Sequence, residues 1–202
     1  MSAEDFQTIL SAAQAGADWA VTALYRAHNP RVLRYLRAQE PADCADVASD
    51  TWLDAARNLR TFTGTEDDFA GWLFTITRRR LTDHRRAKHR RLSDPAPDAA
   101  FATLSSVSAE TMAFTGTLGD EEARRMVEFL PHDQAEIVLL RIVAGLDVDT
   151  VARLTGRRPG TVRVMQHRAL KRLAKELDRD RNERKEASDG TQRDVQAPGP
   201  PR

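Results

Sequence analysis

The side chains best suited to chemistry in this sequence are basic, and they gather in two runs of the chain. From Arg78 to Arg91 there are eight arginines or lysines and one acid, Asp83; from Arg153 to Arg172 there are seven and no acid. Guanidinium and ammonium groups bind phosphate through charge and donated hydrogen bonds. Like charges on one helix repel unless a polyanion relieves them, so the two runs predict two surfaces that bind nucleic acid.

The sequence offers little for catalysis or metal binding. No carboxylate pair or activated nucleophile stands out, and no glycine-rich phosphate loop of the nucleotide-hydrolysing kind is present. Its single cysteine, Cys44, cannot form an internal disulfide or supply a zinc site alone. We therefore expect no metal, no cofactor and no enzymatic activity. The histidines are scattered along the chain: His28, His84, His89, His132 and His167.

The second basic run lies in a predicted helix-turn-helix. A short apolar-periodic helix near Val148–Leu154 leads to a turn at Gly156 and a longer basic helix that begins near Pro159. The residues near the start of the second helix are best placed to reach base edges, and later ones to reach phosphates, although either contact is open for each. The alternative without a nucleic-acid function is a solvated helical hairpin whose arginines and lysines only keep it soluble. The predicted outward residues are Arg157, Arg158, Thr161, Arg163, His167, Arg168 and Lys171.

The elements that must position these residues are helical throughout. Charged residues make up 30% of the 202-residue chain and aromatic residues 6%, which favours helical bundles. Apolar periodicity predicts helices over residues 18–39, with a break near Asn29 and Pro30, over 43–60, and from 66 onward. We predict an all-α fold with two small domains, residues 1–92 and 119–177, a flexible linker, 93–118, and a disordered charged tail, 178–202.

No part of the sequence predicts export or membrane insertion. The N-terminus lacks a basic head followed by an apolar run, and no stretch approaches the roughly 20 apolar residues that span a bilayer. We therefore expect a cytoplasmic protein.

An acidic stripe lies on the second predicted helix. Its members are spaced by three, four and four residues, which places them on one helical face. Such a face avoids DNA, and it is either a docking surface for a basic protein partner or a solvated face whose early acids complement the helix dipole. The stripe consists of Asp43, Asp46, Asp50 and Asp54.

The order of these elements resembles the extracytoplasmic-function sigma factors of the sigma-70 family. ALYRAHNPRVLRYLRA resembles the opening helix of sigma region 2, DCADVASDTWLDAARNL its polymerase-binding helix, and FAGWLFTITRRRLTDHRRAKHRR the helix that borders the −10 promoter element. LPHDQAEIVLLRIVAGLDVDTVARLTGRRPGTVRVMQHRALKRL resembles region 4. Arg79 departs from the asparagine of many relatives, and Arg157 and Arg158 replace a less charged turn.

The resemblance implies a function for each surface. The helix-turn-helix would read the −35 element, and the acidic stripe would dock on the clamp helices of the largest subunit of core RNA polymerase. An unstacked −10 base would be captured by the loop that consists of Phe62, Thr63, Gly64 and Thr65. Phe62 is equally a candidate for the hydrophobic core, and Trp72 is more readily explained as a core residue than as one that stacks on a base. The linker would thread toward the polymerase active cleft. Duplex phosphates would be held by Arg78, Arg79, Arg85 and Arg86.

The partners implied are core RNA polymerase and promoter DNA, with an anti-sigma factor as a further candidate because many members of the family are held inactive by one. The alternative from another class is a free-standing helix-turn-helix regulator that dimerises or senses a ligand. That alternative fits poorly with the acidic stripe, the linker and the second basic helix, since dimeric regulators need a large self-complementary apolar surface.

Overall fold

The computed structural model describes residues 2–93, 123–124 and 128–193, and of residues 92, 93 and 180–193 it describes the backbone alone. None of the described residues lies in a β-strand, which confirms the all-α fold class. The elements in chain order are α1 (Ala3–Gln14), α2 (Asp18–Gln39), α3 (Cys44–Asn58), the 3-10 turn η1 (Leu59–Thr61), α4 (Glu66–Ser93), α6 (His132–Val138), the π-helical segment η2 (Leu139–Val143), α7 (Val148–Thr155) and α8 (Pro159–Arg193).

Helices α1 to α4 form the first unit, and α1 was not predicted from the sequence. Ser2 caps this helix by accepting a hydrogen bond from the Asp5 backbone, and the Asp5 carboxylate accepts one from the Ser2 backbone. Phe6, Leu10 and Ala13 are buried at i, i+4 and i+7. Both signals are present in the sequence, so this helix could have been found.

Helix α2 runs without interruption through Pro30, where the sequence predicted a break. Pro30 donates no backbone hydrogen bond, and the buried Asn29 beside it lies at the centre of a side-chain network. Asn29 donates to the Tyr25 hydroxyl at 2.9 Å and accepts from Trp52 Nε1 at 2.9 Å. This network joins α2 to α3.

An aromatic cluster fills the space between α1, α2 and α4. Phe62 packs against Phe69 with ring centroids 5.4 Å apart and against Trp72 at 5.2 Å, and Phe6 lies 5.9 Å from Phe69. Tyr35 and Phe74 are buried edge to face. The cluster fixes the direction of α4, the helix that carries the first basic run.

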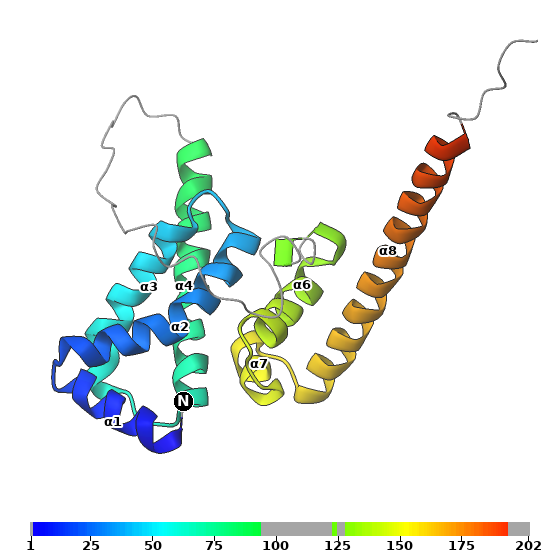
Figure 1. Cartoon of the computed structure of the whole chain (residues 1–202). Coiled ribbons are helices and arrows are strands. Elements are labelled where there is room, and N and C mark those ends of the chain that lie inside the picture. The colour runs from blue at the N-terminus through cyan, green and yellow to red at the C-terminus, as the bar shows by residue number, and fades with distance from the viewer. Residues whose placement is uncertain (1, 94–122, 125–127, 194–202) are drawn as a thin grey trace, which may run out of the picture.

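Helices α6, α7 and α8 form the second unit, with η2 continuing α6. Gly145, which the sequence predicted to end this helix, has φ +72°, in the left-handed region that favours glycine. Ile137, Leu139 and Leu140 are fully buried, because α6 packs against α8 and η2 packs against α2 and α7. Figure 1 shows the two units side by side, with the far part of α8 projecting away from both.

Helix α8 is longer than the sequence predicted. A disordered tail was expected from residue 178, whereas the helix continues to Arg193. Between residues 178 and 193 the chain has no proline and one glycine, and it is rich in arginine, lysine and glutamate, which are good helix formers. Residues 194–202 of the predicted tail and all of the predicted linker except Ser93 lie outside the described residues.

The described part of the chain contains no helix that is both long enough and apolar enough to cross a bilayer.

Candidate nucleic-acid interface

The helix-turn-helix is built by α7 and the start of α8. The Asp147 side chain caps α7 by accepting hydrogen bonds from the backbones of Asp149 and Thr150, at 2.8 and 2.9 Å. Gly156 ends the helix with φ +65°, and the Arg157 backbone then donates to the Ala152 carbonyl at 2.9 Å. This cap turns the chain sharply into Pro159, the first residue of α8.

The inner face of α8 is apolar and the outer face is basic. Val162 and Ala169 are completely buried against the other helices, and Met165 and Leu173 pack beside them. A helix with a basic outer face is the element that DNA-binding helix-turn-helix proteins present to the major groove. Of the predicted residues in this segment, six are exposed: Arg158, Thr161, Arg163, His167, Arg168 and Lys171.

Arg157, the seventh predicted residue, is tied to its own unit. Its guanidinium forms an ion pair with Asp133 of α6, with Nη2 2.6 Å from Oδ2. Asp133 is more exposed than Arg157, so the pair lies at the surface and can exchange partners at a small free-energy cost.

The basic face of α8 continues beyond the predicted residues. A shallow hollow between α6 and α8 is lined by Gln134, Arg168, Lys171, Arg172 and Lys175. Arg172 and Lys175 were not among the predicted contacts, although i, i+3 and i+4 spacing from Arg168 and Lys171 places them on the same side. Four positive charges around one hollow favour an anion such as a backbone phosphate.

The basic face of α4 is divided between solvent and internal partners. Arg79 and Arg86 are exposed, although Arg79 also lies 3.3 Å from an Asp54 oxygen. Arg85 donates to the Gln39 carbonyl at 2.9 Å. Arg78 is bound to the second unit, with Nη2 2.7 Å from Glu136 Oε1. The structure therefore leaves two of the four predicted arginines facing outward.

The loop before α4 has its aromatic ring inside and its polar groups outside. Phe62 is 8% exposed and packs in the aromatic cluster, so the structure places it in the core, the second of its two candidate roles. Thr63 is exposed beside it, and Gly64 has φ +145°. Thr65 and Asp68 cap α4 by mutual hydrogen bonds, which hold the pKa of Asp68 below its usual range.

The acidic stripe of α3 separates into an exposed pair and an internal pair. Asp46 and Asp50 are exposed, close to Leu53, a leucine that is 55% exposed. Asp54 is buried and accepts from Arg80 Nε at 2.7 Å, and this hydrogen bond lowers the pKa of Asp54. Asp46 and Asp50 do not take part in the ion pairs with α4 that engage Asp54 and Asp43.

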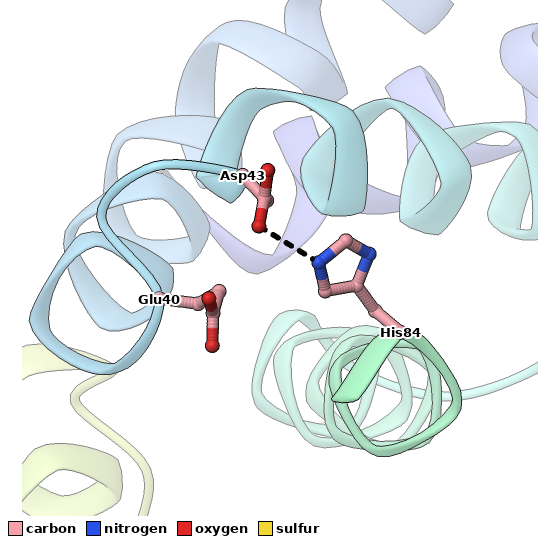
Figure 2. Close-up of side chains that lie close together, drawn as sticks. All are labelled: Glu40, Asp43 and His84. Carbon is pink, nitrogen blue, oxygen red and sulfur yellow. Dashed lines mark hydrogen bonds and ion pairs between the residues drawn. The ribbon is translucent and has the colours of Figure 1, made fainter. Parts of the chain in front are cut away.

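Asp43, the other member of the internal pair, lies in a cluster with Glu40 and His84 (Figure 2). Among the described residues, these three bring potential metal-ligating atoms within 4.8 Å of one another. Lys88 donates to both carboxylates, to Asp43 at 2.9 Å, and His84 Nε2 lies 3.0 Å from Asp43. The hydrogen bonds from Lys88 and His84 lower the pKa of Asp43. The cluster is thus already compensated by an ammonium group, and it ties α3 to α4.

Comparisons with known proteins match both units. The family model "Sigma-70 region 2" matches residues 24–91, and "Sigma-70, region 4" matches residues 120–173. The ECF RNA polymerase sigma factor SigD of Mycobacterium tuberculosis is 30% identical over 185 residues, which cover 88% of this chain and 86% of SigD. BldN of Streptomyces coelicolor, another ECF sigma factor, is 33% identical over 85% of this chain, and the match spans 66% of BldN.

A solved structure shares the fold. The sigma factor RpoE from Bartonella quintana, crystallised with the anti-sigma factor NepR, superposes with a TM-score of 0.54 at 21% sequence identity. The superposition covers 87% of this chain and 95% of RpoE. The arrangement of helices in both units is therefore one that experiment has observed.

Proposed function

The chain belongs to the extracytoplasmic-function sigma factors of the sigma-70 family, and we propose that it binds core RNA polymerase and directs it to promoters by reading the −35 and −10 elements. The observation that carries this proposal is the face of α8. Between Arg158 and Lys171 six polar or basic residues are exposed and no acid occurs, and the inner side of this segment is buried in a helix-turn-helix. A soluble hairpin has no need of such segregation.

The −35 element is read by the start of α8. Thr161 and Arg163 lie in the first turns of the helix and reach base edges, where arginine can donate two hydrogen bonds to one guanine. Arg168 and Lys171 lie about two turns further on and bind phosphates, together with Arg172 and Lys175 of the same hollow.

The −10 element is bound by α4 and the loop before it. Arg79 and Arg86 are exposed and bind duplex phosphates, while the loop at Thr63 and Gly64 receives an unpaired base. The buried Phe62 supports this loop from beneath and does not stack on the base. Arg78 and Arg85 can contribute only after they leave their present partners.

Core polymerase is bound by the exposed part of the acidic stripe, which consists of Asp46 and Asp50. The exposed Leu53 nearby supplies an apolar contact to the polymerase. The clamp helices of the largest subunit are the proposed partner surface. Desolvated apolar side chains surrounded by charges are typical of such interfaces. Asp43 and Asp54 support the surface by holding α3 against α4.

Promoter opening by this protein requires no catalysis of its own. We propose that binding free energy from base capture and phosphate contacts drives the step, with no cofactor. An anti-sigma factor is a candidate regulator, since the structurally similar RpoE was solved with one.

Size-exclusion chromatography with purified bacterial core RNA polymerase tests the proposal. We expect the wild-type protein to co-elute, and the Asp46→Lys, Asp50→Lys variant to elute alone with unchanged circular dichroism. The matched control is Asp83→Lys, an exposed acid of α4 outside the stripe, which should co-elute. A folded wild-type protein that fails to co-elute would favour the free-standing regulator instead.

A further inference from the structure

An acid of α6 lies beside the basic side of α8. The first turn of α6 contains Asp133 and Gln134, and Gln134 lines the hollow between α6 and α8 together with four basic residues of α8. Consecutive Cα atoms are about 3.8 Å apart, so Asp133 lies next to that hollow. A carboxylate is therefore present at the edge of a surface that is otherwise suited to phosphate.

Arg157 holds this carboxylate by a charge-assisted hydrogen bond. Its Nη2 donates to Asp133 Oδ2 at 2.6 Å, while the Arg157 backbone is fixed by its hydrogen bond to the Ala152 carbonyl. The side chain of Asp133 is 58% exposed and that of Arg157 33%. The guanidinium can therefore turn toward an incoming phosphate, but only if it leaves Asp133.

The carboxylate of Asp133 loses its close partner when Arg157 moves. His132 Nδ1 lies 3.8 Å from Asp133 Oδ1, which is beyond hydrogen-bond range. An uncompensated carboxylate beside the DNA backbone repels the phosphates. Binding of DNA through Arg157 is therefore opposed twice, by the ion pair that must break and by the negative charge that remains.

We propose that Asp133 occupies the place of a DNA phosphate on Arg157 and thereby limits the affinity of α8 for duplex DNA of any sequence. Phosphate contacts supply essentially all of the affinity for non-specific DNA, so such an acid lowers the occupancy of non-specific sites. Base contacts are unaffected, and the ratio of affinities between two sequences stays the same. This inference rests on the proposed function, because it requires that α8 binds DNA.

Fluorescence anisotropy of the full-length protein with a labelled duplex of arbitrary sequence tests the proposal, because no promoter needs to be known. Asp133→Asn keeps the shape of the side chain and removes its charge. We expect this variant to bind the duplex about twofold to fivefold more tightly at low salt, the factor that corresponds to one surface ion pair.

Two comparisons separate the ion pair from the change in net charge. Asp149→Asn removes an exposed acid from the first turn of α7 and changes the net charge equally, and it should tighten binding less than Asp133→Asn does. In an Arg157→Gln background, the effect of Asp133→Asn should approach that of Asp149→Asn, because the guanidinium that the substitution releases is absent.

Equal gains in affinity from Asp133→Asn and Asp149→Asn would overturn the proposal, and so would an undiminished gain in the Arg157→Gln background. Circular dichroism checks that each variant is folded, and Asp133→Ser serves in place of Asp133→Asn if the latter does not fold. A wild-type protein that binds no duplex even at low salt refutes DNA binding by α8 and the inference with it. A protein that behaves as expected on DNA yet never binds polymerase refutes the proposed function and leaves the role of Asp133 standing.

Discussion

Replacing Asp54 by asparagine separates the structural half of the acidic stripe from the docking half. The Asp54 side chain is 10% exposed, and its carboxylate accepts from Arg80 at 2.7 Å, with Arg79 at 3.3 Å and Arg57 at 3.4 Å. An asparagine of the same shape keeps one acceptor but turns its amide toward a guanidinium. We expect Asp54→Asn to destabilise the first unit, and Asp50→Asn to leave its stability unchanged.

The magnitude follows from the hydrogen bonds lost. A hydrogen bond to a charged group contributes about 1.5–3 kcal/mol, and the partial exposure of Arg80 places the loss near the lower part of that range, about 2 kcal/mol. For a unit of this size that corresponds to a fall in Tm of about 10 °C. Asp50 is exposed, and its neutralisation should change the free energy of unfolding by less than about 0.5 kcal/mol.

Thermal unfolding followed by circular dichroism measures the first effect, and co-elution with core polymerase at 15 °C measures the second. Asp54→Asn should unfold early and still bind polymerase when folded, whereas Asp50→Asn should unfold normally and bind weakly. The reverse pattern, with Asp54→Asn at wild-type Tm and without polymerase binding, would refute the division of the stripe. Because the hydrogen bond from Arg80 lowers the pKa of Asp54, its stabilisation is present at neutral pH and is lost as pH falls through the lowered value.

Three further predictions concern single residues. Arg163→Ala should weaken binding to a −35 duplex by about tenfold to a hundredfold in a gel-shift assay and leave polymerase binding intact; an equal loss on every sequence would assign Arg163 to phosphate. Lys171→Ala should weaken binding uniformly across sequences and reduce the salt slope by about 1, and an unchanged slope would contradict a phosphate contact. Burial, and next the positive charge of Arg31, lower the pKa of His28 to about 4. As pH falls, the unfolded chain therefore takes up the proton first, and the wild-type protein should lose up to about 3 kcal/mol of its free energy of unfolding between pH 6.5 and 4. Urea titrations at both pH values should show a smaller loss for His28→Leu than for the wild type, and equal losses would exclude His28 as the cause.

The helix-turn-helix could be predicted because its signals are local. Apolar periodicity, the Gly156 turn and Pro159 all lie within one short segment, and the exposed residues of α8 are the ones that the period placed outside. The same local reasoning would have found α1, since Ser2 and Asp5 form a capping box before an apolar period.

The division of the acidic stripe was harder to foresee. At 3.6 residues per turn, the separation of eight positions between Asp46 and Asp54 leaves an offset of about 80°, so the stripe drifts around α3. Where it drifts to depends on α4, whose Arg80 lies 26 residues further along the chain. Periodicity gives the drift, but only the packing of the two helices decides which acids remain exposed.

The hydrogen-bond partners of Arg78 could not be predicted from local sequence patterns. Its partners Glu136 and Leu154 are 58 and 76 residues away, in the other unit. A basic run predicts affinity for negative charge, and here part of that affinity is satisfied within the chain. The close approach of Gly71 in α4 to the Thr150 side chain in α7 could not be predicted either, because in the sequence a glycine inside a helix indicates only a local weakness of that helix.

Run-off transcription on fragmented genomic DNA of the source bacterium tests the central claim most directly. Core polymerase with this protein should yield discrete transcripts that core polymerase alone does not make, and Arg163→Ala should reduce them. If no discrete transcript arises from a polymerase that is active on a tailed template and co-elutes with the protein, the assignment as a promoter-reading initiation factor is contradicted.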